Sequence, residues 1–278
     1  MSAVSKRVGN GRLKTINNMK PKAIILYGYG INCDNETEYG FEMAGAVAER
    51  VHINQLIGGD KKLADFQILA VPGGFSFGDD LGAGKVLAVK LRYGLGMQLN
   101  DFIRAGKLVI GICNGFQALV KLGILPGFDK DYDRQNVTLT NNDNGRFQDR
   151  WVHLAANKKS PCVWTKDIDK LFLPIRHGEG KFIFKDAAIR NRFVAQNQIV
   201  LQYSDPLGRI QGFPHNPNGS EMNVAGICDE TGRIFGLMPH PEGNMFPQQN
   251  PLWTREAVAE GAGLKVFKNA VEFASANL

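Results

Sequence analysis

Cys113 is the first residue whose surroundings suggest chemistry, because an apolar run leads directly into it and a helix-like segment follows it. Residues 107–112 are predicted to form a buried strand, and residues 114–122 a helix. A thiol at such a turn lies at the positive end of a helix dipole, which favours the thiolate over the thiol. A cysteine at a strand end is also common as core filler, and Cys33, in the first glycine-rich loop, is a rival nucleophile. No helix start is expected immediately after Cys33, so Cys113 is the stronger candidate.

Two His-x-Glu pairs, His177–Glu179 and His240–Glu242, each combine a side chain that can act as a base with a carboxylate that can orient it. In extended backbone, residues i and i+2 point the same way, so the carboxylate accepts a hydrogen bond from one imidazole nitrogen. The other nitrogen is then free to take a proton from a thiol. Pro241 stiffens the second pair, which follows a continuous apolar strand, and both features favour it. Two alternatives stay open: a metal site made of all four side chains, or histidines that are hydrogen-bonded loop residues.

Glycine-rich loops follow two of the predicted strands. Gly73 and Gly74 lie just past a strand end, where the N–H of Gly74, together with that of Asn114, could act as an oxyanion donor. The run GFSFG that begins at Gly74 also matches a nucleophile elbow, but an elbow needs a strand and a helix directly beside it, and loop-like residues flank Ser76. Residues 28–33 are a partial dinucleotide-binding fingerprint without its third glycine. A turn against a ligand or a neighbouring loop is the better interpretation.

These residues need a scaffold in which strand ends meet. Strands and helices alternate in the first half of the chain, which predicts a parallel sheet covered on both faces. The second half is richer in strands. The sequence therefore predicts an α/β fold with a mostly parallel central sheet, helices on both faces, and added strands in the second half. In such sheets ligands bind outside the carboxyl ends of the strands. The predicted strands are 23–27, 51–56, 67–72, 107–112, 152–155, 181–184, 199–203, 224–228 and 234–238, and the predicted helices are 35–49, 85–104, 114–122 and 263–274.

The composition is that of an ordinary globular protein, with 44% hydrophobic and 22% charged residues among 278. No apolar run approaches the roughly 18 residues of a membrane span, and the N-terminus lacks the apolar segment of a secretory signal. The net charge of +6 comes entirely from six basic residues before position 23, which leaves 27 basic against 27 acidic residues in the remainder. We therefore predict no nucleic-acid partner, a flexible basic tail over residues 1–21 (or a start at Met19), and one domain over 22–278.

The four cysteines are dispersed and none has metal-ligand spacing, so a structural zinc site is not expected. Dispersed free cysteines indicate a reducing compartment, and together with the missing secretory signal they predict a cytoplasmic protein. Cys162 and Cys228 lie in apolar runs, which is typical of inert packing.

Taken together, the Cys113 turn, the upstream Pro-Gly-Gly loop and the late His-Pro-Glu run resemble a class I glutamine amidotransferase. The likeness narrows to the glutaminases of phosphoribosylformylglycinamidine synthases. A middle stretch, NGRFQDRWVHL with SPCVW, is similar to the longer glutaminase region of the fused, single-chain synthases. The chain departs from the family at Gly243, where Arg often follows the His-Pro-Glu run. The resemblance spans the predicted domain and rests on six runs in order: GINCDNETE (30–38), PGGFSFGDDLGAGK (72–85), GICNGFQAL (111–119), LPIRHGEGKF (173–182), NPNGSE (216–221) and GLMPHPEG (236–243).

The resemblance implies a Cys-His-Glu triad. Cys113 would attack the side-chain amide of glutamine and form a γ-glutamyl thioester. His240 would take the thiol proton, pass it to the departing ammonia and then activate water, while Glu242 orients His240. The oxyanion N–H groups would come from Gly74 and Asn114.

The resemblance also implies how the chain meets its substrate and partner. Gln117, Gly73 and Phe75 would contact L-glutamine, and the loop of the first His–Glu pair, with residues 216–220, would be pocket wall or partner-facing structure. A separate synthase subunit would receive the ammonia and convert formylglycinamide ribonucleotide to the amidine. ATP and magnesium are expected in that partner, because this chain has no G-x4-G-K-[ST] loop, and no cofactor or metal is expected here.

The sequence leaves three points about the function open. One is whether a small third subunit joins the complex. Another is a cysteine hydrolase that acts on other γ-glutamyl compounds and releases its product without a synthase. The last is a binding subunit with a dead site, against which the intact Cys113, His240 and Glu242 argue.

Overall fold

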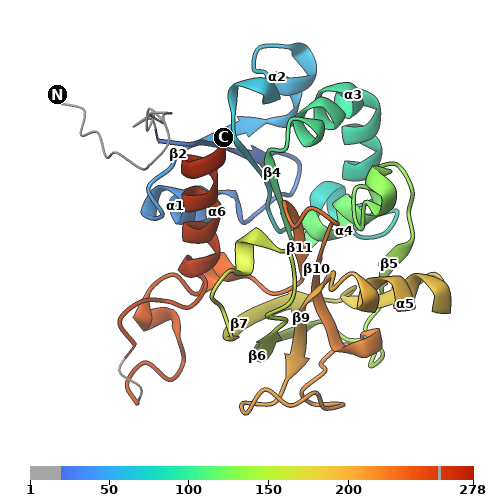
Figure 1. The fold of residues 1–278 in the computed structure, drawn as a ribbon, viewed down its shortest axis with the longest axis vertical. Helices are drawn as coiled ribbons and strands as arrows, with labels where there is room; N and C mark the ends of the chain where they lie inside the picture. Colours follow the sequence, from blue (N-terminus) through green and yellow to red (C-terminus); the bar gives the residue numbers. More distant parts are fainter. Residues whose placement is uncertain (1–19, 256–257) are drawn as a thin grey trace, which may run out of the picture.

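A large β-sheet runs through the centre of the protein (Figure 1). The computed structural model describes residues 20–255 and 258–278. Within them, the sheet has nine strands in the order β2-β1-β3-β4-β11-β10-β9-β6-β7, and β5 pairs with β8 in a separate small sheet. The strands are β1 (Lys22–Tyr27), β2 (Val47–His52), β3 (Ile68–Val71), β4 (Leu108–Ile112), β5 (Val137–Thr140), β6 (Gln148–Ala156), β7 (Lys170–His177), β8 (Lys181–Phe184), β9 (Ile199–Ser204), β10 (Val224–Cys228) and β11 (Ile234–Leu237).

The first half of the sheet, from β2 to β11, is parallel. Strands β3, β4 and β11 are buried along their whole length, which is why they appear in the sequence as continuous apolar runs. Figure 1 shows α1 and α6 on one side of this half and α3 and α4 on the other. The helices are α1 (Asp34–Met43), α2 (Ile53–Gly58), α3 (Lys85–Arg104), α4 (Asn114–Leu122), α5 (Ala187–Ala195) and α6 (Leu264–Asn277).

The second half of the sheet is antiparallel: β10, β9, β6 and β7 follow β11 in that order. Strand β7 is tied to the segment after β11, since the His240 N–H donates to the carbonyl of Pro174, within β7, at 2.9 Å. The predicted α/β class, with helices on both faces and extra strands in the second half, is confirmed. This topology brings the ends of β3, β4, β11 and β7 to one place.

Several predicted elements differ from the structure. The helix predicted over 35–49 stops at Met43, because Gly45 takes a φ of 98° and turns the chain back into β2. The strand predicted over 51–56 has the wrong bounds. Strand β2 begins at Val47 and ends at His52, which caps helix α2. Strands β5 and β7 and helix α5 were not predicted.

The basic tail predicted for residues 1–21 lies almost wholly outside the described residues, since the description starts at residue 20. Among the helices of the described ranges, none is both long and apolar enough to span a lipid bilayer.

Candidate active site

Cys113 occupies the tight turn between β4 and α4 that the sequence predicts. Its backbone has φ 50° and ψ −105°, a conformation that non-glycine residues rarely adopt and that is typical of strained functional turns. The helix start packs directly against the end of β3: a side chain at Gly115 would place its Cβ 1.8 Å from the Val71 carbonyl oxygen. The thiol is almost buried and lies 3.6 Å from the Arg176 carbonyl oxygen at the end of β7.

The Gly73–Gly74 loop crosses the loop after β1 beside this turn. The Asn32 N–H donates to the Gly73 carbonyl at 3.0 Å and the Phe75 N–H to the Gly30 carbonyl at 2.8 Å. These bonds flank an antiparallel bridge between Ile31 and Gly74, so the pair itself is of the non-hydrogen-bonded kind and the Gly74 N–H takes no part in the pairing. The loop at residues 28–33 therefore packs on a neighbouring loop, as predicted.

Asn114 ties the glycine loop to the helix start. Its N–H belongs to the first turn of α4, where backbone donors have no partner within the helix. Its side-chain oxygen accepts from the Ser76 N–H at 3.1 Å, and its amide nitrogen donates to Asp79 at 2.9 Å and to Gln117 at 3.0 Å. The N–H groups of Gly74 and Asn114 thus stand on two segments that one side chain holds together.

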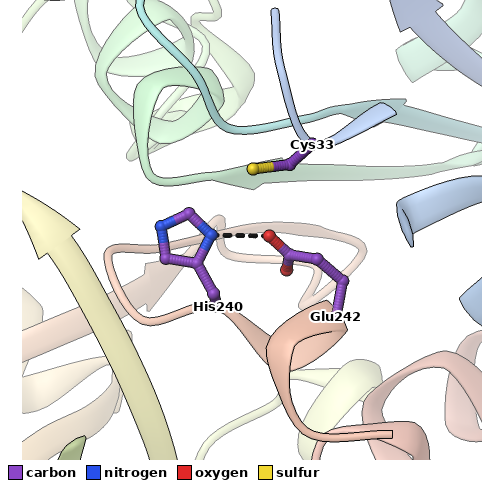
Figure 2. A group of neighbouring side chains, drawn as sticks. All are labelled: Cys33, His240 and Glu242. Carbon is purple, nitrogen blue, oxygen red and sulfur yellow. Dashed lines mark hydrogen bonds and ion pairs between the residues drawn. The ribbon is translucent and has the colours of Figure 1, made fainter. Parts of the chain in front are cut away.

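His240 and Glu242 follow β11, the parallel neighbour of β4. Leu237 pairs with Ile112, and the Cys113 N–H donates to the Leu237 carbonyl at 2.8 Å, so the histidine segment leaves the sheet beside the Cys113 turn. His240 Nδ1 and Glu242 Oε1 are 2.5 Å apart, and both side chains are nearly inaccessible (Figure 2). The predicted pairing of this His-x-Glu is confirmed.

The environment of His240 favours its charged form. Burial by itself lowers the pKa of the imidazole, but the negative charge of Glu242, together with the thiols of Cys113 and Cys33, outweighs it and holds this pKa well above the usual value. Within the described residues, His240 Nε2 has no hydrogen-bond partner. One imidazole nitrogen is therefore fixed by the carboxylate, and the other is available for proton transfer.

The first His-x-Glu pair does not form. His177 Nδ1 lies 3.2 Å from Asn142 Oδ1, while Glu179 Oε2 accepts from the Ala83 N–H at 3.2 Å. Burial lowers the pKa of His177 to about 3, so its imidazole is neutral. The two pairs also make no joint metal site: in the described part of the chain, the group of potential metal ligands is Cys33 with His240 and Glu242.

A cavity of about 150 Å³ opens directly beside the Cys113 thiol. Three charged residues, Asp79, Glu179 and Arg176, are among those that line it, and burial raises the pKa of Asp79. Gln117 also lines it and donates a hydrogen bond to the Glu179 carbonyl. A larger cavity of about 550 Å³ lies between the 157–169 segment and α6 and contains none of the candidate residues.

The remaining predicted residues are placed as follows. Phe75 lines the cavity and is half exposed, whereas Gly73 faces the His240 ring, which lies 2.9 Å from the position a Cβ would take. Ser76 is buried in a short 3₁₀ turn, with no strand or α-helix directly beside it, as expected. A side chain at Gly243 would place its Cβ 2.7 Å from the ring of Pro174, so this position has no room for the family's arginine.

The structure corrects one prediction about the site and adds two residues to it that the sequence did not point to. The expectation that no helix start follows Cys33 is wrong, because α1 begins at Asp34, and Cys33 lies at the site beside His240. Arg176 was missed because its strand, β7, was not predicted. Asp79 was missed because it ends the short 3₁₀ turn after the glycine loop, with a φ of 54°. Its contact with Asn114 has no signature in the spacing of the residues.

Comparison with known proteins agrees with this geometry. A family model for the CobB/CobQ-like glutamine amidotransferase domain matches residues 20–274. The PurQ subunit of phosphoribosylformylglycinamidine synthase from Dehalococcoides mccartyi is 52% identical over 92% of this chain and 98% of the relative. The PurQ subunit from Methanococcus maripaludis is 44% identical over 91% of this chain and 97% of the relative.

A solved structure is similar as well. A chain of the PurLQS structure from Thermotoga maritima has 30% sequence identity and a TM-score of 0.67, and the match covers 92% of this chain and 99% of that one. With a family match over nearly the whole chain and relatives of this identity, the protein belongs to the CobB/CobQ-like glutamine amidotransferase family, among its PurQ subunits of phosphoribosylformylglycinamidine synthase.

Proposed function

We propose that this chain is the glutaminase subunit of a phosphoribosylformylglycinamidine synthase and that Cys113 is its nucleophile. The observation that carries the proposal is the meeting of a strained Cys113 turn with a buried imidazole–carboxylate pair. A thiol, a base and a group that orients the base are the parts that nucleophilic catalysis requires. Cys113 follows β4, and His240 and Glu242 follow β11, the parallel neighbour of β4.

In the proposed reaction, His240 takes the thiol proton and the Cys113 sulfur attacks the side-chain carbonyl carbon of glutamine. The N–H groups of Gly74 and Asn114 bind the resulting oxyanion. As the C–N bond breaks, His240 gives its proton to the leaving nitrogen, which departs as ammonia and leaves a γ-glutamyl thioester. His240 then takes a proton from water, whose oxygen attacks the thioester carbonyl and releases glutamate and the thiol. Glu242 keeps the imidazole oriented and stabilises its positive charge.

The cavity beside Cys113 suits an amino acid that carries both charges. Asp79 and Glu179 offer negative charge for the α-ammonium group, and Arg176 offers positive charge for the α-carboxylate. Gln117 is placed to contact the substrate from α4, and Phe75 covers the mouth. Gly73 leaves the space in which the imidazole lies. In this proposal L-glutamine binds with its side chain toward Cys113.

The mouth of the cavity is the surface proposed to meet the synthase. Phe75 and Phe147 are each about half exposed, with ring centroids 6.2 Å apart, and Leu81 is 76% exposed nearby in the chain. Exposed apolar groups gathered at a functional opening are typical of a protein contact. Ammonia released here would then pass to the partner and not to water. ATP and magnesium belong to that partner in this proposal, and the cytoplasm is the expected compartment, in keeping with four free thiols.

The test compares two nitrogen sources in the assembled complex. With Cys113→Ala, synthesis of the amidine from glutamine should fall below detection, while synthesis from added ammonium salt should keep its wild-type rate. Loss of both activities, or retention of the glutamine-dependent one, contradicts the proposal. The isolated chain should hydrolyse glutamine weakly and γ-glutamyl peptides not at all, whereas a chain that prefers the peptides is the alternative hydrolase.

A further inference from the structure

Cys33 is a second thiol at the catalytic imidazole, and the proposed reaction does not use it. It directly precedes α1, more than two hundred residues before His240 in the sequence. Its sulfur, an imidazole nitrogen of His240 and a carboxylate oxygen of Glu242 all lie within 4.8 Å of one another. Figure 2 shows the Cys33 side chain next to the His240–Glu242 pair.

One buried carboxylate oxygen at this point lacks a partner. Within the described residues, Glu242 Oε2 has no hydrogen-bond partner, although it is inaccessible to solvent. A buried acceptor without a partner costs about 1–3 kcal/mol, so its presence in a folded protein points to a ligand or to a catalytic use. Cys33 is the least buried of the three residues.

The donor set matches one class of cation. Thiolate, imidazole and carboxylate together are typical ligands of Zn²⁺, whereas magnesium and calcium prefer oxygen alone. Zn–S bonds are about 2.3 Å and Zn–N and Zn–O bonds about 2.0–2.2 Å, so the ligand atoms of a tetrahedral site lie roughly 3.5 Å apart. The three ligand atoms lie within 4.8 Å of one another, and Glu242 Oε1, 2.5 Å from His240 Nδ1, must move away from the imidazole to make room for the ion.

We propose that Cys33, His240 and Glu242 form a zinc-binding site, with water as the fourth ligand, and that zinc bound there inhibits the enzyme. Zinc replaces the proton between His240 Nδ1 and the Glu242 carboxylate, and the remaining imidazole proton stays on Nε2, so His240 no longer accepts the Cys113 proton. Binding releases the Nδ1 proton of the charged imidazole and the proton of the Cys33 thiol, because the ligands are the imidazole nitrogen and the thiolate. The inhibition rests on the proposed glutaminase function, whereas the metal site does not.

Binding is tested on the full chain carrying Cys113→Ala, which removes the nucleophile as a ligand. Co²⁺ serves as the spectroscopic probe, and Zn²⁺ affinity is measured by competition with a chromogenic chelator. We expect one metal ion per chain and a thiolate-to-cobalt charge-transfer band. Adding Cys33→Ser should remove the band and weaken Zn²⁺ binding at least about tenfold. Cys33→Ala repeats the test with a side chain of another size, and Cys162→Ser, at a buried thiol outside the site, should change neither quantity.

Inhibition is tested on the complex by the zinc concentration that halves the glutamine-dependent rate, each variant relative to its own uninhibited rate. Cys33→Ser should raise that concentration at least about tenfold, and a chelator should restore the wild-type rate. A charge-transfer band that survives Cys33→Ser, or one that Cys113→Ala alone removes, overturns the proposed site. Zinc binding to a chain that shows no glutaminase activity in the complex would instead refute the function and leave the site standing.

Discussion

Replacing Gly73 with alanine should displace His240, the proposed catalytic base, without unfolding the protein. The φ of Gly73 lies outside the left-handed region, so alanine fits the backbone. Its Cβ, however, would lie 2.9 Å from His240 Cε1, against 3.4–4 Å for an ordinary contact. The imidazole must therefore move by roughly 0.5–1 Å, and a displacement of this size in a reacting geometry costs about 100-fold in rate, or about 2.7 kcal/mol of transition-state stabilisation.

The assay for Gly73→Ala is the glutamine-dependent rate of the complex, with the ammonium-dependent rate and the melting temperature measured in parallel. We expect only the glutamine-dependent rate to fall. Gly96→Ala is the matched control: a Cβ there meets nothing within 4 Å, so the rate should stay unchanged and α3 should gain about 1 kcal/mol at most. A wild-type rate in Gly73→Ala, or a loss that accompanies unfolding, would refute the geometry described for His240.

Three further predictions follow from the site. Glu242→Gln should lower the glutamine-dependent rate by roughly 10³-fold or more, with the ammonium-dependent rate unchanged, because the imidazolium loses its buried counter-charge and its fixed tautomer. Gly74→Ala should lower the melting temperature and abolish the glutamine-dependent rate, since Gly74 has φ 150° and a Cβ there would lie 2.4 Å from the Gly30 carbonyl oxygen. Acidification should destabilise the fold through His177: its pKa of about 3 in the folded state lies below the ordinary value near 6.5, so the unfolded chain binds the extra proton. From pH 7 to pH 5 this removes about 2 kcal/mol from the free energy of unfolding, and urea titrations of the wild type and His177→Gln should differ by that amount, whereas equal pH dependence would contradict it.

The sequence was sufficient to predict the elements on either side of Cys113. Strand β4 and helix α4 have sharp signatures, a continuous apolar run followed directly by an amphipathic segment, and the predicted helix boundaries of α4 agree with the structure. Helix α3 was likewise predicted over its full length. These elements are short-range patterns, which is why residue spacing alone finds them. The same reasoning placed Cys113 at the turn and favoured His240 with Glu242 over the first pair.

What the sequence could not predict depends on contacts between distant segments. Cys33 reaches the site because the loop after β1 hydrogen-bonds to Gly73, more than forty residues later along the chain. The Arg176 carbonyl reaches the Cys113 thiol because β7 joins the edge of the antiparallel half and its Pro174 carbonyl accepts a hydrogen bond from the His240 N–H. The first His-x-Glu pair fails for a similar reason, since Asn142 and Ala83 compete successfully for the two side chains.

The most direct test of the central claim is to identify the residue that carries the glutamyl group. The complex is mixed with isotope-labelled glutamine and quenched in acid during turnover, and the labelled peptide is sequenced by mass spectrometry. The label should be found on Cys113 and should be absent from the Cys113→Ser protein. A label on Cys33, or none on any thiol of a complex that is actively consuming glutamine, would contradict the account.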